Sequence, residues 1–442
     1  MSSGIRDTSY VFASQISYVI TQIGTQSCLA WVLGPEKRGE YAICLVFSTL
    51  LNMFCMLGCD TASVYFVSSK KLNLSEGVLY TYIYGGFGSL FAIVVGLIIM
   101  QFPLSFLTKA SPEAFYLAMA GIPTTFFVTV LIRLFTGIGQ FKWFTIFTVY
   151  SQILQFLFTV LFVLVFKSGV TGALWSNIIP SIIVIATIMF FLKTRFGFSS
   201  QPVSYQKLKD MFHYGLRYYI GKISNTVNVQ VGTIILAFMA SPIEVGLFAV
   251  ASQLTIRATM FPDALVGTLT PRAAIDKDGK KMAIAYCARL TMIVCGIILL
   301  LMAVFAKPVV MILFSSKFIS AVPLIQILCA GTFVRCISKV YIPYLLGINR
   351  PGTASFSVAV GTIANIVLLW FLLPMIGIKG AALGTTISYI VSSGILLFAF
   401  KKYSKLNFAE MFSFRSSDFE PFRHVINMFY RKIISYIKKV IK

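Results

Sequence analysis

The chain has 442 residues, of which 58% are hydrophobic and only 12% are charged. A soluble domain carries roughly 25% charged residues, whereas the mean hydropathy of this chain is +0.86. The apolar residues fall into runs long enough to cross the roughly 30 Å of hydrocarbon in a bilayer. These features exclude an ordinary soluble protein, and we expect a lipid bilayer to be the solvent.

The net charge of +23 does not indicate nucleic-acid binding. Lys and Arg gather on short loops between the apolar runs and on the C-terminal tail. This pattern is typical of topology determinants that face anionic lipid. We therefore expect anionic membrane lipid, and no nucleic acid, among the partners.

Twelve apolar runs predict twelve transmembrane helices and an all-α polytopic fold. The first run lacks the apolar core and small-residue cleavage site of a signal peptide, so we expect it to be retained. The predicted spans are 9–33, 41–67, 78–102, 114–137, 143–166, 170–192, 212–238, 245–269, 285–306, 321–346, 354–373 and 380–400.

The distribution of Lys and Arg predicts the orientation of these spans. If both termini are cytoplasmic, 23 Lys and Arg fall on that side and seven, including Lys37 and Arg38, fall on the other. The positive-inside rule favours this arrangement.

Three sequence landmarks recur with offsets of 207, 210 and 208 residues. They are Gly39–Ala42 and Gly246–Ala249, Gly137–Gln140 and Gly347–Arg350, and Gly169–Leu174 and Gly377–Leu383. Ordered repeats at one offset predict two parallel six-helix lobes with substrate between them and alternating access by rocking. The predicted domains are an N-terminal lobe (1–192), a cytoplasmic linker (193–210), a C-terminal lobe (211–400) and a basic amphipathic cytoplasmic tail (401–442).

Polar side chains recur at helical spacing in the first and seventh spans, including Tyr18, Gln22, Asn225 and Asn228. Equivalent stripes in two repeated halves predict a cavity lined by both spans. The alternative is that these residues bind helix to helix through hydrogen bonds.

Seven cations lie within the predicted spans, but only two acids lie at comparable depth. A cation inside a membrane usually faces a partner or a wet cavity, and the surplus therefore predicts an anionic substrate. The better candidates for substrate binding are Lys222, Arg257, Arg335 and Lys339. For Arg133, Arg217 and Arg289 we favour contact with lipid headgroups, while Arg133 and Arg217 remain secondary candidates.

The two acids, Asp60 and Asp263, are candidates for coupling transport to a proton or sodium gradient. The alternative is that each is a structural counter-ion. No cofactor is expected, and the eight cysteines include no C-x-x-C pair that would indicate a metal site. The sequence also lacks the P-loop, G-x-S-x-G and H-E-x-x-H patterns, so we expect a transporter and not an enzyme.

The tail alternates apolar and basic residues at helical spacing over residues 419–442. This pattern predicts a helix on the inner membrane leaflet. Recruitment of a polysaccharide polymerase or glycosyltransferases is the sharper hypothesis.

Several of these motifs resemble the polysaccharide flippases of the multidrug/oligosaccharidyl-lipid/polysaccharide (MOP) exporter superfamily. Leu33-Gly34-Pro35-Glu36 with Arg38–Ala42 resembles that family's "lGp..yG.ya" signature. Its further landmarks match Gly58–Ala62, Gly137–Lys142, Glu244–Gly246 and Pro374–Leu383, in order. The resemblance covers about residues 8–400.

The resemblance implies a V-shaped, MATE-like pair of lobes in a bacterial inner membrane. It also implies transfer of an undecaprenyl-diphosphate-linked oligosaccharide, such as an O-antigen unit of lipopolysaccharide, from the inner to the outer leaflet. Cavity cations would then hold the diphosphate.

Three alternatives fit less well. An ion-coupled drug antiporter of the same superfamily should carry acids in its cavity. A major-facilitator transporter usually has a G-x-x-x-D-R-x-G-R-R-like loop after its second span, which residues 68–74 lack. A membrane glycosyltransferase or polymerase commonly has a long external loop, and none is predicted here.

Overall fold

The structure is a computed structural model that describes all residues except 1, 198–202, 264–265, 267–278, 349 and 414–442. The helix predicted for 419–442 lies outside the described residues. All regular secondary structure in the described part is helical, and this part contains no strand.

The N-terminal lobe comprises α1 to α6. These are α1 (Ser2–Met56), α2 (Cys59–Ser68), α3 (Leu74–Met100), the short η1 (Leu107–Lys109), α4 (Pro112–Gly137), α5 (Phe141–Thr159) with a π-helical end (Val160–Val165), and α6 (Gly169–Phe196).

The C-terminal lobe comprises α7 to α16. These are α7 (Tyr205–Met239), α8 (Pro242–Ile256), η3 (Arg257–Thr259), α10 (Gly279–Val304), α11 (Ala306–Phe314), η4 (Ser316–Ala321), α12 (Val322–Lys339), α13 (Ile342–Gly347), α14 (Pro351–Ile376), α15 (Ile378–Ser404) and α16 (Phe408–Phe412).

Within the described residues, nine helices are long and apolar enough to cross a membrane. One of them, Ser17–Met56 in α1, covers part of each of the first two predicted spans, and α7 and α8 occupy the predicted seventh and eighth. The apolar part of α7 is shorter, Thr226–Met239. Each of the twelve predicted spans therefore has a helix, and the all-α polytopic fold is confirmed.

Helix α1 reverses direction at Gly34. Gly34 has φ 69° and ψ 178°, a conformation that glycine adopts at little cost, and Pro35 supplies no N–H to continue the preceding turn. Arg38 contacts Gln26, which is 12 residues earlier, whereas a straight helix would separate them by about 18 Å. The two segments of α1, 2–33 and 35–56, are therefore two antiparallel spans.

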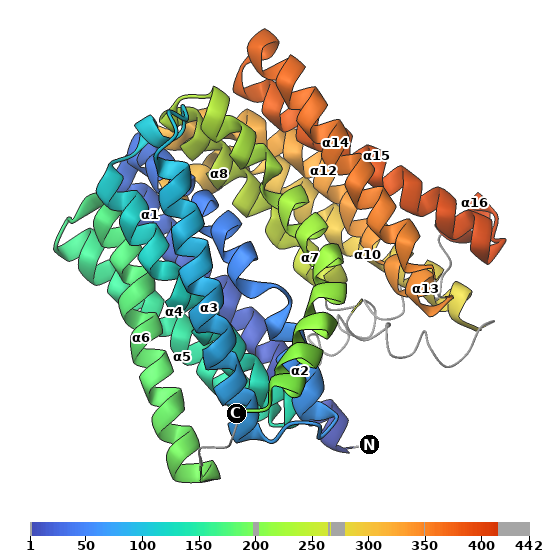
Figure 1. The fold of residues 1–442 in the computed structure, drawn as a ribbon. Helices are drawn as coiled ribbons and strands as arrows, with labels where there is room; N and C mark the ends of the chain where they lie inside the picture. The colour runs from blue at the N-terminus through green and yellow to red at the C-terminus, as the bar shows by residue number, and fades with distance from the viewer. Residues whose placement is uncertain (1, 198–202, 264–265, 267–278, 349, 414–442) are drawn as a thin grey trace, which may run out of the picture.

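The two lobes form a V. In Figure 1, α1–α6 and α7–α15 meet at the end near the start of α8 and diverge toward the opposite end. At the joined end, α1 packs against α8 and α11.

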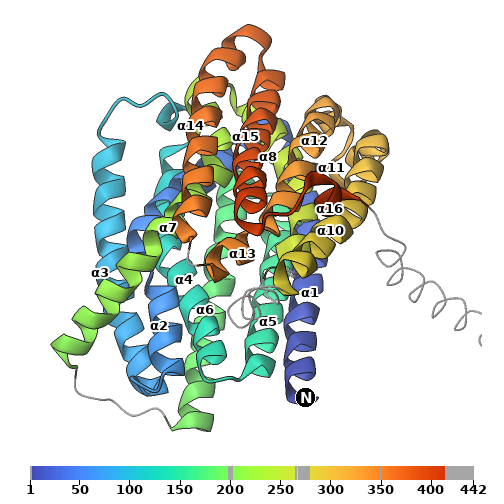
Figure 2. The ribbon, with the colours of Figure 1, turned by 90° about the vertical axis from the view of Figure 1, so that its right-hand side faces the viewer.

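Helix α7 also reaches across to the N-terminal lobe at the diverging end, as Figure 2 shows. There, Lys207 Nζ lies 2.6 Å from Glu76 Oε1, and the ring centroids of Tyr65 and Tyr214 stack 4.2 Å apart. The first turns of α7 therefore bridge the two lobes.

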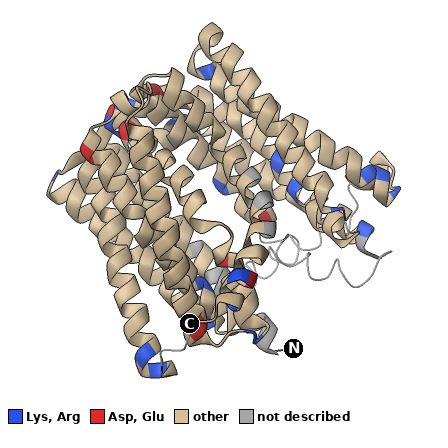
Figure 3. Cartoon of the chain, in the orientation of Figure 1, with Lys and Arg blue, Asp and Glu red and all other residues tan. Residues whose placement is uncertain are grey.

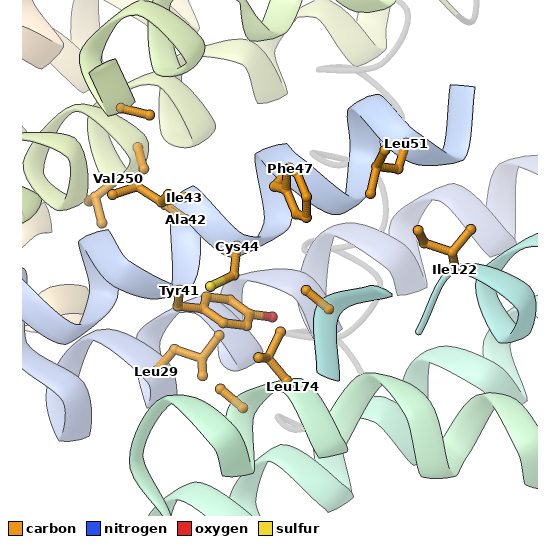
Figure 4. Close-up of a cluster of buried hydrophobic side chains, with 14 of the residues drawn as sticks. Leu29, Tyr41, Ala42, Ile43, Cys44, Phe47, Leu51, Ile122, Leu174 and Val250 are labelled. Carbon is orange, nitrogen blue, oxygen red and sulfur yellow. The ribbon is translucent and has the colours of Figure 1, made fainter. Parts of the chain in front are cut away.

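The second segment of α1 lies at the centre of the molecule. Figure 4 shows Tyr41 and Cys44 on the side of Leu174 of α6, and Ala42 and Ile43 beside Val250 of α8. One buried apolar cluster thus joins the lobes along this segment.

Charged residues gather mainly at the ends of the helices, and long stretches between them carry none (Figure 3). This distribution is that of a multi-pass membrane protein. The few charges placed between the ends are therefore the natural candidates for function.

Candidate functional site

The lobes touch at a glycine seam formed by Pro35 and Gly39 of α1 and Pro242 and Gly246 of α8. A Cβ atom on Gly39 would lie 1.7 Å from the Pro242 carbonyl oxygen, and one on Gly246 would lie 2.1 Å from that of Pro35. Gly39 and Gly246, the first pair of repeated sequence landmarks, thus face each other and form the contact between the lobes.

A lysine supports the same end of the molecule. Lys109 Nζ donates to the carbonyl oxygens of Ala237, Phe238 and Ala240, at 2.7, 3.0 and 2.8 Å. Burial lowers the pKa of this ammonium group, and the charge of Glu244 partly opposes that effect. The ammonium group interacts favourably with the carbonyl groups at the C-terminus of α7. This is a second contact between the lobes, in addition to the glycine seam.

The polar stripe of the first span faces α8. The guanidinium of Arg257 lies 5.1 Å from the ring centroid of Tyr18, within range of a cation–π interaction between the lobes. Arg257 is half-buried, and no described residue forms an ion pair or a hydrogen bond with it. Its charge is therefore available to a ligand at the boundary of the lobes.

Gln22 also lies on this stripe and begins a polar chain inside the N-terminal lobe. Its Nε2 donates to Gln155 Oε1 at 3.4 Å, Gln155 donates to Asn177, and Asn177 donates to the Tyr41 hydroxyl at 2.9 Å. The stripe therefore bonds helix to helix and also contacts the other lobe, while the cavity predicted between the first and seventh spans stays a prediction.

Arg335 lies inside the C-terminal lobe and is 8% exposed. Its Nη1 donates to Asn228 Oδ1 at 3.2 Å, and its guanidinium lies 4.5 Å from the ring centroid of Tyr389. The amide and the ring orient this cation but leave its charge unneutralised.

Two ion pairs occupy corresponding spans of the two lobes. Arg133 of α4 lies 2.7 Å from Asp60 of α2, and Lys339 of α12 lies 2.7 Å from Asp263, which follows η3. The paired residues are 73 and 76 positions apart. Each acid has a cationic partner, which favours the counter-ion alternative.

Two cavities flank the second segment of α1. One, of about 200 Å³, lies toward the C-terminal lobe, and the other, of about 290 Å³, lies within the N-terminal lobe. Leu45 and Thr49 line both. The other lining groups include Asn228, Ser252, Thr385 and Tyr389 in the first, and Asn52, Gln155, Asn177 and Ser181 in the second. Among the lining residues are amides and hydroxyls but no acid, which suits neutral hydroxylated ligands such as sugars.

Three predicted residues of α7 cannot be placed. The side chains of Arg217, Lys222 and Asn225 lie outside the described residues, so their roles remain predictions. Arg289 donates to the Glu410 carbonyl oxygen at 3.0 Å and is 3% exposed.

Arg38 was expected on a short loop between the first two spans, but it lies in the helical segment of α1 that follows Gly34. Its side chain is 0% exposed because the glycine seam brings α8 against it. Lys37, the preceding residue, is exposed. Hydropathy does not distinguish these neighbouring cations, and the repeated Gly39 and Gly246 were used only as evidence of two halves.

Ion pairing separates two sets of cations on the described helices. Asp60 and Asp263 neutralise Arg133 and Lys339, whereas Arg38, Arg257 and Arg335 have no acid within ion-pair distance in the described part of the chain. Arginine donates two parallel hydrogen bonds to carboxylate or phosphate. The described interior therefore holds guanidinium groups without an acid partner at more than one position.

Comparison with known proteins gives the family. Residues 5–275 match the model of a family described as polysaccharide biosynthesis protein. A probable low-salt glycan biosynthesis flippase of Haloferax volcanii, Agl15, is 21% identical over 44% of this chain and 42% of its own length. The chain spans only 40% and 42% of the lengths of the curated relatives it matches.

Two solved structures share the fold. A lipid II flippase, MurJ, in an inward closed conformation superposes with a TM-score of 0.73 at 15% identity, over 99% of this chain and 100% of the other. An inward-facing MATE-family multidrug resistance transporter of the MOP superfamily gives 0.71 at 14% identity, over 88% and 98%. The V-shaped twelve-helix fold is therefore that of the MOP superfamily, and the chain belongs to the polysaccharide biosynthesis protein family.

Proposed function

We propose that this chain is a flippase, not an enzyme, that moves a lipid-linked oligosaccharide across the membrane by alternating access. Arg257 carries the proposal because it is an unneutralised cation where the two lobes meet. The substrate class is an undecaprenyl-diphosphate-linked oligosaccharide such as an O-antigen repeat unit.

The charges and the cavities suit different parts of this substrate. Arg257 and Arg335 offer paired N–H donors to the diphosphate, while the amide and hydroxyl groups of the two cavities suit sugar hydroxyls. The isoprenoid chain needs no site inside the protein because it can remain in the bilayer.

The proposed setting is a bacterial inner membrane with both termini in the cytoplasm. In that orientation the lobes are closed at the outer end, where the glycine seam lies, and diverge toward the cytoplasm except where the first turns of α7 bridge them. Such a state would load a lipid made on the inner side. Coupling to a proton or sodium gradient through Asp60 or Asp263 stays a prediction, as does contact with a polymerase or glycosyltransferases.

Reconstitution tests this function against drug export. Proteoliposomes containing the full chain are expected to expose a fluorescent undecaprenyl-diphosphate oligosaccharide to membrane-impermeant dithionite faster than protein-free vesicles. They should not accelerate efflux of ethidium, an organic cation, because the described interior carries unneutralised arginines that repel cations. Ethidium efflux without lipid transfer would contradict the proposal and favour the drug antiporter.

A further inference from the structure

Arg38 is a charged side chain enclosed at the contact between the lobes. It is 0% exposed and is among the largest fully buried side chains. It precedes Gly39, which packs directly against Pro242 and Gly246. Arg38 therefore lies in the part of the interface that must separate if the lobes open at this end.

Only part of the hydrogen-bonding capacity of the Arg38 guanidinium is used by its described neighbours. Its Nη2 donates to Gln26 Oε1 and, at 3.5 Å, to Gln253 Oε1 of the opposite lobe. The guanidinium lies 5.2 Å from the ring centroid of Tyr41. Within the described chain, Nε and Nη1 have no hydrogen-bond partner. A buried ion without a counter-ion costs several kcal/mol in effective desolvation. Burial of the Arg38 charge therefore opposes closure of the glycine seam.

A small enclosed space lies between the residues that hold Arg38 and Arg257. Gln26 and Gln253, which hold Arg38, line this space of about 20 Å³ together with Gln22, Arg257 and four apolar side chains, Ile23, Val250, Leu254 and Phe314. Gln253 and Arg257 are four residues apart, as are Gln22 and Gln26, so each pair shares a helix face. The two arginines thus stand at either end of one stripe between the lobes.

We propose that Arg38 is a second anion-binding site, which opens when the lobes part and which takes the diphosphate from Arg257 on the release side. This inference rests on the proposed function. Opening would remove Gln253 from Arg38 and, with the bond to Gln26 kept, leave up to four of its five N–H donors for phosphate oxygens. Because the anion would bind Arg38 only in the open state, it would shift the lobes toward that state.

A structural role as a latch predicts different behaviour. A latch is strongest when its hydrogen bonds are complete, yet the contact from Arg38 to the opposite lobe is a single 3.5 Å bond to a neutral amide. If Arg38 only held the seam closed, removing it would ease opening. If Arg38 receives the diphosphate, removing it would slow transfer.

The test compares Arg38→Gln and Arg38→Lys with Lys37→Gln, which removes the exposed cation next to it. Binding of undecaprenyl diphosphate to the purified full-length chain and flipping of its fluorescent oligosaccharide derivative are both measured. All three variants should bind within about twofold of wild type, because Arg38 is enclosed in the loading state. Arg38→Gln should flip at least about tenfold more slowly, equivalent to about 1.4 kcal/mol, with Arg38→Lys intermediate and Lys37→Gln unchanged.

Flipping by Arg38→Gln at the wild-type rate or faster would overturn the inference, and so would loss of lipid binding. If Arg38→Gln does not fold, inorganic pyrophosphate added on the release side should inhibit wild type more strongly than Arg38→Lys, and equal inhibition would overturn the inference. A wild-type chain that neither binds nor flips the lipid would refute the proposed function, and the role of Arg38 with it.

Discussion

Replacing Arg257 with Gln is expected to weaken binding of undecaprenyl diphosphate about thirtyfold. The estimate corresponds to about 2 kcal/mol, a typical value for a hydrogen-bonded contact with a charged group. The fold should survive, because no described residue depends on Arg257 for an ion pair or a hydrogen bond. The affinity is measured by titrating the purified full-length variant with the lipid.

Two variants control this result. Lys193→Gln removes an exposed cation at the end of α6 and should leave the affinity unchanged. Arg257→Lys should restore only part of it, since an ammonium group cannot donate the paired bonds of a guanidinium. Unchanged affinity in Arg257→Gln would show that the diphosphate binds elsewhere.

Replacing Gly39 with Ala is expected to prevent the glycine seam from closing. The added Cβ would lie 1.7 Å from the backbone oxygen of Pro242, which cannot rotate away as a side chain can. Overpacking typically costs about 1–3 kcal/mol, and a contact this short on backbone atoms belongs at the upper limit. Since alternating access requires a state closed at this end, flipping should fall at least about tenfold, which again equals about 1.4 kcal/mol.

Gly86→Ala is the matched control for the seam. Gly86 lies in α3 of the same lobe, and nothing lies within 4 Å of an added Cβ there. This variant should flip at the wild-type rate, whereas Gly246→Ala should behave like Gly39→Ala. Full activity of both seam variants would mean that the lobes do not need this contact.

The sequence predicted the architecture because bilayer thickness and repetition are visible in a single chain. Hydropathy separated the spans, and the Gly39 and Gly246 landmarks identified two halves. The same landmarks did not reveal that the two glycines touch. The break at Gly58, where φ is 78°, was also missed, because the hydropathy of the second span continues through it.

The partners of the candidate site residues could not be predicted from the sequence. Hydropathy gives the depth of a charge but not its partner, so the pairing of Asp60 with Arg133, 73 residues away, could not be read from one sequence. Arg38 was missed for a related reason: it stands near the end of a span in the sequence, and only the packing of α8 encloses it. Arg257 and Arg335 were selected as candidates because their depth alone made them unusual, and their role in binding stays a prediction.

The central claim is that unneutralised arginines between the lobes bind a lipid diphosphate. The most direct test is the affinity of the purified full-length chain for undecaprenyl diphosphate compared with undecaprenol, which has the same chain without phosphate. We predict at least about thirtyfold tighter binding of the diphosphate, or about 2 kcal/mol, decreasing as salt concentration rises. Equal affinity for the two lipids would contradict the account.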